Sequence, residues 1–511
     1  MTAAPAGAPT APGPAAEPGP DPDDSRCGGV EDLLARSAWT ARIETTAADR
    51  TRMAASREVF ERARERRDVY GATRGFGPLV DYPADTDPGA QGLGLIRHLA
   101  AGQGEPLAPA VTRTMVWLRL RGMTAGHSAV EPELWRSLAD QWNAGFTPVV
   151  PRDGSLSASG DLVPLAHAAL AATGAGEGQA AWTDPRRPGA GRERPDVVLR
   201  RLGLPGAVWD ARGALAFVNG SGACLAQALH NHRELAAAVR LAAAATGRLA
   251  ALLGADPDPY HDGLSRVRNQ PGQRRAAALI RAELPPGHVR GAARPLQERY
   301  SLRCAPQVLG AVLDQLRFQE EVLLAEAAGC TDNPVTVDGA ILHGGNFHAA
   351  PVALASESHA TCAQQVALLM ERQLALLLDP RANGGLPPLL APVPGRDSGL
   401  AGVQIAASSH LSRIRQLGYP ASMTTIPTNL ENQDHVPLAL NSATAVADML
   451  DRLRWIAGGL LLALTQAGHL TGARPSGLWA RLAEAAPPLQ RDRPLAAEVA
   501  ALAELALAAG T

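Results

Sequence analysis

Five long runs rich in alanine and leucine most constrain how this chain can fold. They cover residues 222–253, 306–328, 349–378, 399–417 and 442–467. Several are longer than twenty residues, and they lack the two-residue alternation of strands, so they predict long helices. A helix that is apolar on more than one side must bury that surface against several neighbours, which in long helices are often other subunits. The runs therefore predict a mostly helical protein that forms an oligomer.

The charge and the cysteines exclude several other classes of protein. The net charge is -2 and aromatic residues make up 4% of the chain, so the basic surface of a nucleic-acid-binding protein is not expected. Five cysteines are scattered without paired spacing, which is typical of free thiols in the cytoplasm. The longest purely apolar runs are short for a membrane span. Residues 1–28 lack the basic and apolar segments of a signal peptide and are expected to form a disordered tail.

All 48 residues counted as lysine or arginine are arginine. An enzyme that uses pyridoxal phosphate needs a lysine for its internal aldimine. A P-loop nucleotide hydrolase needs a lysine for its phosphates. Both classes are therefore disfavoured, and no metal site is predicted either.

Two glycine-rich segments interrupt the helical regions. The first, at 69–78, follows a predicted helix at 47–66 and holds three glycines and a proline around two aromatic residues, so it is a candidate mobile lid. A polar stretch at 174–196 is predicted to be a flexible surface insertion rather than core.

The second glycine-rich segment contains Ser157, Ala158, Ser159 and Gly160. Such small residues allow the Gly160 nitrogen to approach the Ala158 carbonyl carbon. Ring closure and loss of the Ser159 hydroxyl, each releasing one water, would leave an imidazolone with an exocyclic methylidene, which is a strong electrophile. The alternative is an ordinary helix start capped by Ser157 or Ser159, and this segment alone leaves both possibilities open.

The run ASGDLVPLAHAAL resembles the signature of the histidine, phenylalanine and tyrosine ammonia-lyases, whose Ala-Ser-Gly matures into 4-methylideneimidazole-5-one (MIO). Further segments resemble the same family in the same order: YGATRGFGPL, FVNGSGA, QERYSLRCAPQVLGA, TDNP and GGNFH. The resemblance implies the all-α, fumarase/aspartase-like lyase fold with a long central helical bundle and a small mixed N-terminal part. It also implies an MIO-bearing unit at 29–215, the bundle at 216–475, C-terminal helices at 476–511, and a homotetramer with shared active sites.

The resemblance also implies catalytic roles. Elimination of ammonia needs a base on one side and an electrophile that holds the amine on the other. Tyr70 matches the base. Arg303 matches the residue that pairs with the substrate carboxylate. Tyr300, one helical turn before Arg303, matches a tyrosine that handles protons. Asn219 matches an asparagine beside the MIO and the substrate. The other residues expected to line the pocket are Gly77, Asn333 and Phe347. Ordinary loop, surface or core roles are the alternatives.

Two pairs of residues bear on the substrate, an aromatic amino acid. Asn432 and Gln433 resemble the Asn-Gln pair of phenylalanine and tyrosine lyases, whereas histidine lyases carry glutamate where Gln433 stands. His98 and Leu99 match the His-Leu pair of tyrosine lyases, and a histidine can bond a para-hydroxyl group. The chain is therefore expected to eliminate ammonia from L-tyrosine to give p-coumarate.

Four alternatives remain. They are a phenylalanine lyase that forms trans-cinnamate, a tyrosine or phenylalanine 2,3-aminomutase, a histidine lyase, and a non-catalytic scaffold of the same fold. Arg74 stands where the family usually has threonine, and Glu298 where it has aspartate. Such departures suggest a specialised rather than a housekeeping enzyme.

Overall fold

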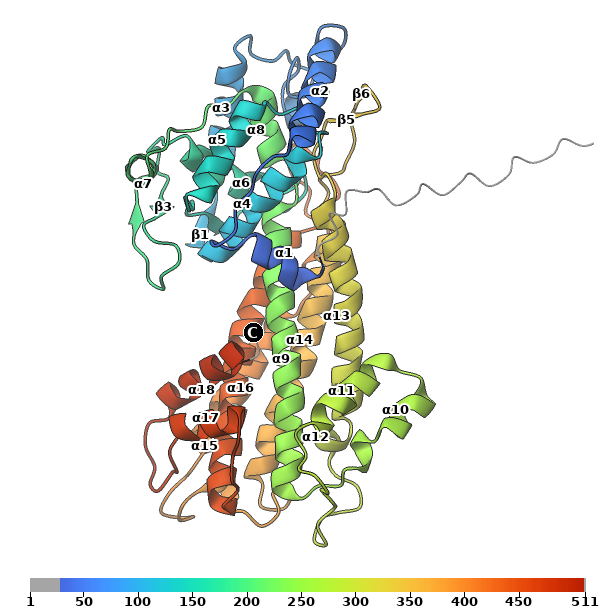
Figure 1. Cartoon of the computed structure of the whole chain (residues 1–511), viewed down its shortest axis with the longest axis vertical. Helices are drawn as coiled ribbons and strands as arrows, with labels where there is room; N and C mark the ends of the chain where they lie inside the picture. The colour runs from blue at the N-terminus through green and yellow to red at the C-terminus, as the bar shows by residue number, and fades with distance from the viewer. Residues whose placement is uncertain (1–27, 510–511) are drawn as a thin grey trace, which may run out of the picture.

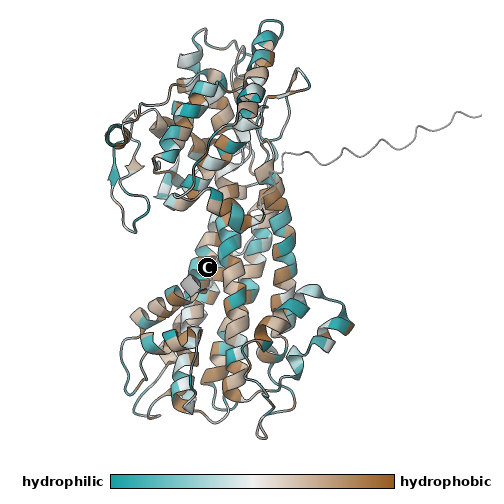
Figure 2. Cartoon of the chain, viewed as in Figure 1, coloured by the Kyte–Doolittle hydropathy of each residue, from teal (hydrophilic) through white to brown (hydrophobic). Residues whose placement is uncertain are grey.

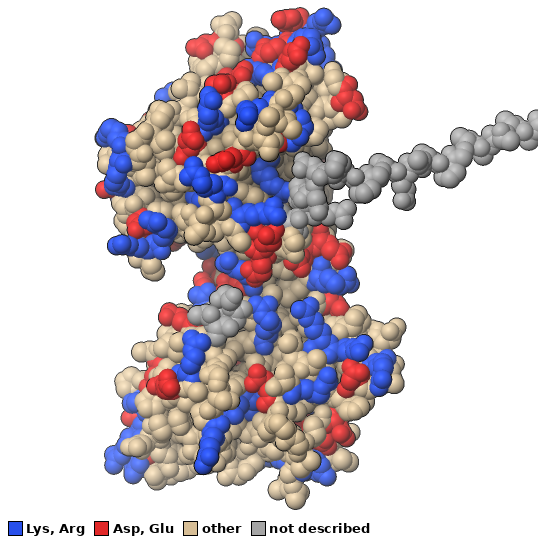
Figure 3. Space-filling view, viewed as in Figure 1, with Lys and Arg blue, Asp and Glu red and all other residues tan. Residues whose placement is uncertain are grey.

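The computed structural model describes residues 28–509 and shows an elongated, mostly helical molecule with two stacked parts (Figure 1). The predicted all-α fold is confirmed. Most of the predicted tail at 1–28 lies outside the described residues. Arginines and acidic residues are interspersed on the face shown in Figure 3, as expected for a chain of nearly balanced charge.

The lower part is a bundle of long helices. They are α9 (Gly222–Leu253), α13 (Ala305–Ala328), α14 (Ala350–Leu378), α15 (Ala401–Leu417) and α16 (Ala439–Thr471). All five predicted helices are present, and α9 has the predicted bounds. α14 packs against the other four. The continuous stretch Ala211–Leu253 is long and apolar enough to cross a membrane, but 67% of its most apolar window is buried inside the protein, as in a core helix.

Shorter helices flank the bundle. At its far end lie α10 (Asp262–Arg268), α11 (Pro271–Arg281), α12 (Tyr300–Arg303) and the single turn η2 (Asp258–Tyr260). α17 (Leu478–Ala485) and α18 (Ala496–Ala509) pack against α16. Two more single turns are η3 (Pro388–Leu390) and η4 (Ala421–Met423).

The upper part is built from shorter helices. They are α1 (Val30–Arg36), α2 (Ala47–Arg64), α3 (Pro88–Leu99), α4 (Pro109–Thr124), α5 (Pro132–Asn143), α6 (Leu162–Ala172), α7 (Pro195–Leu202) and α8 (Ala211–Val218), with the turn η1 (Gly77–Leu79). The bundle helices reach into this part, since the first turns of α9, α14 and α16 belong to its hydrophobic core. The two parts are therefore joined by continuous helices.

The described strands form three antiparallel pairs. They are β1 (Gln103–Pro106) with β2 (Pro151–Asp153), β3 (Ala181–Trp182) with β4 (Arg192–Glu193), and β5 (Val335–Val337) with β6 (Ala340–Leu342). The β3–β4 hairpin lies within the predicted insertion at 174–196. Its Ala181 is fully buried beside Phe146, so part of this segment is core, which its polar composition concealed.

Candidate active site

The segment before α6 forms a tight turn that only small residues can adopt. Ala158 and Gly160 form an isolated bridge, Ser157 has a φ of 54°, and Gly160 a φ of 69°. A Cβ atom on Gly160 would lie 2.3 Å from the nitrogen of Gly220. The residue that precedes α6 is Asp161, and no side chain caps the helix. The alternative that Ser157 or Ser159 is a helix cap is therefore wrong.

Asp161 holds this turn against the start of α9. One of its carboxylate oxygens accepts hydrogen bonds from Ser155 Oγ (3.0 Å) and Ser157 Oγ (2.7 Å). The other accepts from the backbone nitrogens of Ala223 (2.9 Å) and Cys224 (2.7 Å). Asp161 is completely buried, and a carboxylate is favourable at the positive N-terminal end of a helix. Its charge therefore ties two segments together behind the turn.

Two amide side chains converge on Ser159. Asn219 Nδ2 donates to the Ser159 carbonyl oxygen (2.7 Å), and Gln433 Nε2 donates to the Ser159 hydroxyl (2.7 Å). The buried Oδ1 atom of Asn219 has no hydrogen-bond partner in the described chain, so it can accept a bond from a bound molecule. The tight turn and these two donors fit a ring formed from residues 158–160, because they contact the carbonyl and the hydroxyl that such a ring formation involves.

A strained loop presents Gln433 to the turn. Backbone bonds join Thr428 and Gln433 in both directions, at 3.2 and 3.3 Å. Between them, Asn429, Leu430 and Glu431 all have positive φ values of 52–61°, a conformation that is unfavourable for residues other than glycine. Gln433 is half-buried, whereas its predicted companion, the neighbouring asparagine at 432, is exposed and contacts the site through no described side-chain bond.

Tyr70 lies in the glycine-rich loop with its hydroxyl turned inward. The backbone nitrogen of Gly77 donates to the Tyr70 oxygen (2.7 Å), and the Tyr70 ring meets Phe76 edge-on with centroids 6.2 Å apart. Burial raises the pKa of Tyr70, while the bond from Gly77 has the opposite, smaller effect. The backbone nitrogen of Tyr70 donates to His343 Nε2 (3.2 Å), which connects the loop to the segment after β6.

His98 and Leu99 close α3 near the same turn. A Cβ atom on Gly102, three residues after Leu99, would lie 3.0 Å from the side chain of Val163 at the start of α6. His98 is exposed, and its Nδ1 atom lies 3.1 Å from the Gly94 carbonyl oxygen. Because a carbonyl only accepts, Nδ1 carries the proton. The Nε2 atom of a neutral His98 is therefore left as an acceptor.

Asn333 and Phe347 lie on either side of a glycine pair. Asn333 Oδ1 accepts a hydrogen bond from the backbone nitrogen of Gly344 (2.7 Å), which fixes the segment that leads to the half-buried Phe347. The next residue, His348, contacts the carbonyl of His435 (3.2 Å). This segment therefore lies beside the loop that carries Gln433.

Tyr300 and Arg303 are close to each other but far from Ser159 in the same chain. The Arg303 guanidinium carbon lies 4.7 Å from the centroid of the Tyr300 ring, as their spacing predicts. Gln373 connects their helix to α9, since it donates to the Ser301 carbonyl (2.9 Å) and to Thr246 Oγ1 (2.7 Å).

The length of α9 gives the scale of this separation. The first turn of α9 binds Asp161 through Ala223 and Cys224. Thr246 lies roughly 23 residues further along the same helix, which at about 1.5 Å per residue is about 35 Å. Figure 1 shows α12 at the far end of the bundle and α6 in the upper part. The expectation that Tyr300 and Arg303 complete the site is therefore not met within a single chain.

Two buried charged residues that the sequence analysis did not select bind segments next to Ser159 and Asn219. They are Asp161 and Arg119, which are 0% and 5% exposed. Arg119 stands between two leucines that follow Val116 and Trp117, and a charge beside such apolar residues can signal a buried bonded group. That signal is available in the sequence but does not identify the partners.

The chain is similar to several known proteins along nearly its whole length. A family model described as aromatic amino acid lyase matches residues 29–487. A tyrosine ammonia-lyase of Cereibacter sphaeroides is 39% identical over 469 residues, which cover 86% of this chain and 88% of that protein. A histidine ammonia-lyase of Symbiobacterium thermophilum is 36% identical over 496 residues, covering 93% and 94%.

The chain is also similar to a solved structure along nearly its whole length. A tyrosine aminomutase from Streptomyces globisporus superposes with a TM-score of 0.87 at 28% identity, covering 95% of this chain and 96% of that one. These similar proteins differ in their named activities, so the choice among the activities depends on the site.

Proposed function

Because this chain belongs to the aromatic amino acid lyase family, we propose that it eliminates ammonia from L-tyrosine without oxidation and forms p-coumarate. It is a carbon–nitrogen lyase. The observation that carries the proposal is the meeting of two neutral amides, from Asn219 and Gln433, at Ser159. A glutamate at position 433 is expected of a lyase that acts on an imidazole, and this chain has an amide there.

The proposed cofactor is MIO, formed from Ala158, Ser159 and Gly160. When formed, it supplies the electrophile that holds the amine of the substrate. Asn219 would hold the carbonyl that Ser159 contributes, since its Nδ2 atom already donates to that oxygen. Gln433 would face the carbon from which the hydroxyl has departed, because its amide contacts that hydroxyl before the loss.

Tyr70 is the proposed base for the β-hydrogen of the substrate. The backbone nitrogen of Gly77 donates to its oxygen, and such a bond favours the phenolate, which is the form that accepts a proton. Burial opposes ionisation and raises the pKa of Tyr70. A nearby positive charge would favour the phenolate, and Arg303 of a second copy is the proposed source of that charge.

The preference for tyrosine rests on His98. Its Nδ1–H group is engaged by the Gly94 carbonyl, so Nε2 can accept a bond from the phenolic hydroxyl of tyrosine. A site built for such a bond discriminates strongly against a substrate without the hydroxyl. Leu99 would pack against the ring. The 39% identity to a tyrosine ammonia-lyase supports the same choice.

A homotetramer with shared active sites is the proposed working form. In one chain, Arg303 is far from Ser159, so a second copy must bring its carboxylate-binding residue to the turn. Bundle helices carry large apolar side chains on the surface, among them Phe318 (59% exposed), Leu354 (64%) and Ile405 (72%). Figure 2 shows that hydrophobic residues are frequent along the bundle helices. Such surfaces are typical of subunit contacts. We place this assembly in the cytoplasm.

The principal test is turnover of tyrosine, phenylalanine and histidine in separate incubations. Absorbance reports the acrylate product, and chromatography reports any β-amino acid. We expect p-coumarate from tyrosine as the main product. Turnover of histidine alone would contradict the assignment based on Gln433. A His98→Phe variant should shift the preference towards phenylalanine, and an unchanged preference would remove the basis for tyrosine.

A 2,3-aminomutase is the second candidate, because the structure superposes closely on a tyrosine aminomutase. Such an enzyme returns the amine to the β-carbon instead of releasing it. Formation of β-tyrosine as the main product in the same incubations would favour this candidate over the lyase.

Intact mass tests the cofactor and the catalytic class together. The wild-type chain should be lighter than its sequence by two waters, whereas a Ser159→Ala variant cannot lose the second water. An unmodified mass in wild-type protein would favour a non-catalytic scaffold of the same fold.

A further inference from the structure

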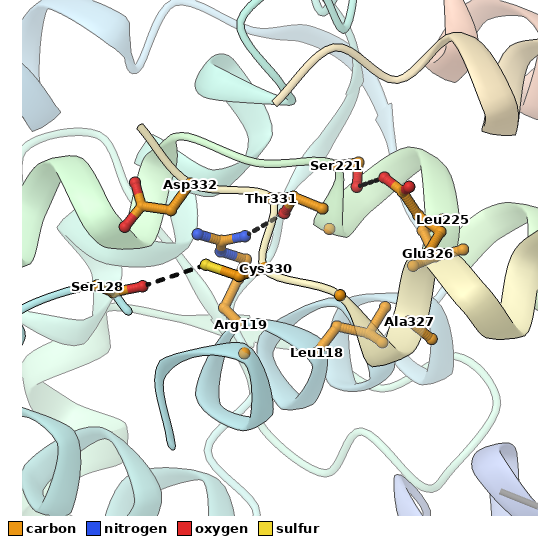
Figure 4. Close-up of a pocket in the computed structure, with 13 residues that line it drawn as sticks. Leu118, Arg119, Ser128, Ser221, Leu225, Glu326, Ala327, Cys330, Thr331 and Asp332 are labelled. Carbon is orange, nitrogen blue, oxygen red and sulfur yellow. Dashed lines mark hydrogen bonds between the residues drawn. The ribbon is translucent and has the colours of Figure 1, made fainter. Parts of the chain in front are cut away.

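The segment 219–221 has a front side that contacts the turn and a rear side that contacts a buried polar cavity. On the front, Asn219 donates to Ser159, and the Gly220 carbonyl accepts from the backbone nitrogen of Asp161 (2.8 Å). On the rear, the cavity lies between α4, the start of α9 and the end of α13 (Figure 4). Ser221 lines this cavity, and so does Arg119, which also contacts Asn219.

Arg119 of α4 occupies the centre of this rear side. Figure 4 shows its guanidinium reaching towards the loop that carries Thr331. It donates to four oxygens: the carbonyls of Ala216, Phe217 (3.1 Å) and Asn219 (3.0 Å), and Thr331 Oγ1 (2.9 Å). We propose that Arg119 is a positioning residue that fixes the backbone of Asn219, and with it the amide that contacts Ser159.

The groups around position 119 explain why an arginine is suited to this position. No carboxylate in the described part of the chain is hydrogen-bonded to Arg119, and burial lowers the pKa of its side chain while Asp332 opposes that shift. The carbonyls it binds are those at the C-terminal end of α8, where the helix dipole is negative. A planar guanidinium offers five donors in a fixed fork, whereas a lysine offers one point charge. A lysine has three N–H groups on a single nitrogen and cannot bind all four of these oxygens at once, whereas arginine can.

Close packing transmits the position of Arg119 to the turn. A Cβ atom on Gly220 would lie 2.0 Å from Arg119 Nη1 and 2.6 Å from Thr331 Oγ1. On the other side of Gly220, a Cβ atom on Gly160 would overlap the Gly220 backbone. Arg119, Gly220 and Gly160 are therefore stacked without space between them, and a shift of the guanidinium must move the segment next to Ser159.

A second contact holds the same segment at its other end. The Ser221 hydroxyl donates to the carboxylate of Glu326 on α13, as Figure 4 also shows. Burial raises the pKa of Glu326, and the bond from Ser221 counteracts part of this effect. Arg119 on α4 therefore holds Asn219, and Glu326 on α13 holds Ser221 at the other end of the same segment.

This inference rests on the proposed function, since Asn219 matters for ring formation and for turnover. A displacement of about 1 Å at such a group can cost about 100-fold in rate. Loss of Arg119 should therefore slow the loss of two waters and lower kcat about 100-fold. KM should change less, because the other proposed substrate-binding residues, among them His98 and Gln433, make no described hydrogen bond to Arg119.

The test compares Arg119→Met and Arg119→Lys with a matched control, Arg113→Met. Arg113 is also on α4 and 2% exposed, and it also donates to backbone carbonyls, those of Trp142 (2.8 Å) and Ala38 (3.1 Å). It does not contact 216–221. Each full-length variant is examined for melting temperature, intact mass, kcat and KM.

We expect Arg113→Met to lower the melting temperature while leaving maturation complete and kcat nearly unchanged. Arg119→Lys keeps the charge and should fold, so it tests the idea even if Arg119→Met does not fold. It should show partial maturation and the reduced kcat. If Arg119→Lys matures fully and has the kcat of the wild type, the inference is wrong. If the wild type itself retains its unmodified mass, the proposed function fails instead.

Discussion

Replacing Asp161 with asparagine should destabilise the protein strongly, although the two side chains have the same shape. The aspartate accepts four hydrogen bonds in a completely buried position. An asparagine has one acceptor oxygen, which must serve the two backbone nitrogens of α9 because these can only donate. Its NH2 group then faces two serine hydroxyls that no longer have an acceptor.

The size of the effect follows from these bonds. A bond to a charged group contributes about 1.5–3 kcal/mol and a neutral one about 1 kcal/mol. Two bonds weakened by about 1 kcal/mol each, and two bonds to a charge lost at about 1.5–3 kcal/mol each, give a loss of about 5–8 kcal/mol. Protein domains have unfolding free energies of about 5–15 kcal/mol, so Asp161→Asn should be near the limit of stable folding.

Urea denaturation followed by circular dichroism can measure this loss. Both the reference and the variants should carry Ser159→Ala, so that no chain forms the ring and all are compared in one covalent state. Asp153→Asn is the matched control, because that carboxylate is 64% exposed and should change the free energy of unfolding by less than about 0.5 kcal/mol. If Asp161→Asn changes it no more than Asp153→Asn does, the role assigned to Asp161 is refuted.

Three further changes test other contacts. Burial, aided by two arginines, lowers the pKa of His343 from its usual 6.5, so its bond to Tyr70 is fully present above that pH and is lost as the pH falls towards the lowered pKa. His343→Gln keeps an acceptor at every pH, and its kcat should therefore decline less on acidification. Gly160→Ala should leave an unmodified mass, because its Cβ would collide with Gly220; complete maturation would contradict the described turn. Arg74→Thr breaks an exposed ion pair and should leave the melting temperature nearly unchanged, so a clear fall in the melting temperature would contradict this expectation.

The sequence predicted the helices well where apolar residues determine them. α9 has the predicted bounds, and α13 begins one residue earlier than predicted. α16 is longer than predicted at both ends, and it starts early because Leu438 adopts a positive φ and lets the helix begin at Ala439. A left-handed leucine is not visible in composition or periodicity, so this start could not be predicted.

The site was only partly predictable, for physical reasons. Motifs indicated Asn219 and Gln433 as site residues, but the distance of 2.7 Å between Gln433 and the Ser159 hydroxyl joins segments 274 residues apart. Only the folded bundle brings these segments together. The separation of Arg303 from Ser159 was equally hidden, since motif order along a chain gives no information about which residues meet within one subunit.

The length of α9 has a genetic consequence. In the proposed assembly, each active site combines the Ser159 turn of one chain with Arg303 of another. A chain with a defective Arg303 therefore keeps an intact Ser159 turn but inactivates a site to which a different chain contributes the turn. A mutant allele can therefore impair wild-type subunits in mixed oligomers. Conversely, two alleles that are each inactive, one in the turn and one at the far end of α9, can restore some intact sites when expressed together.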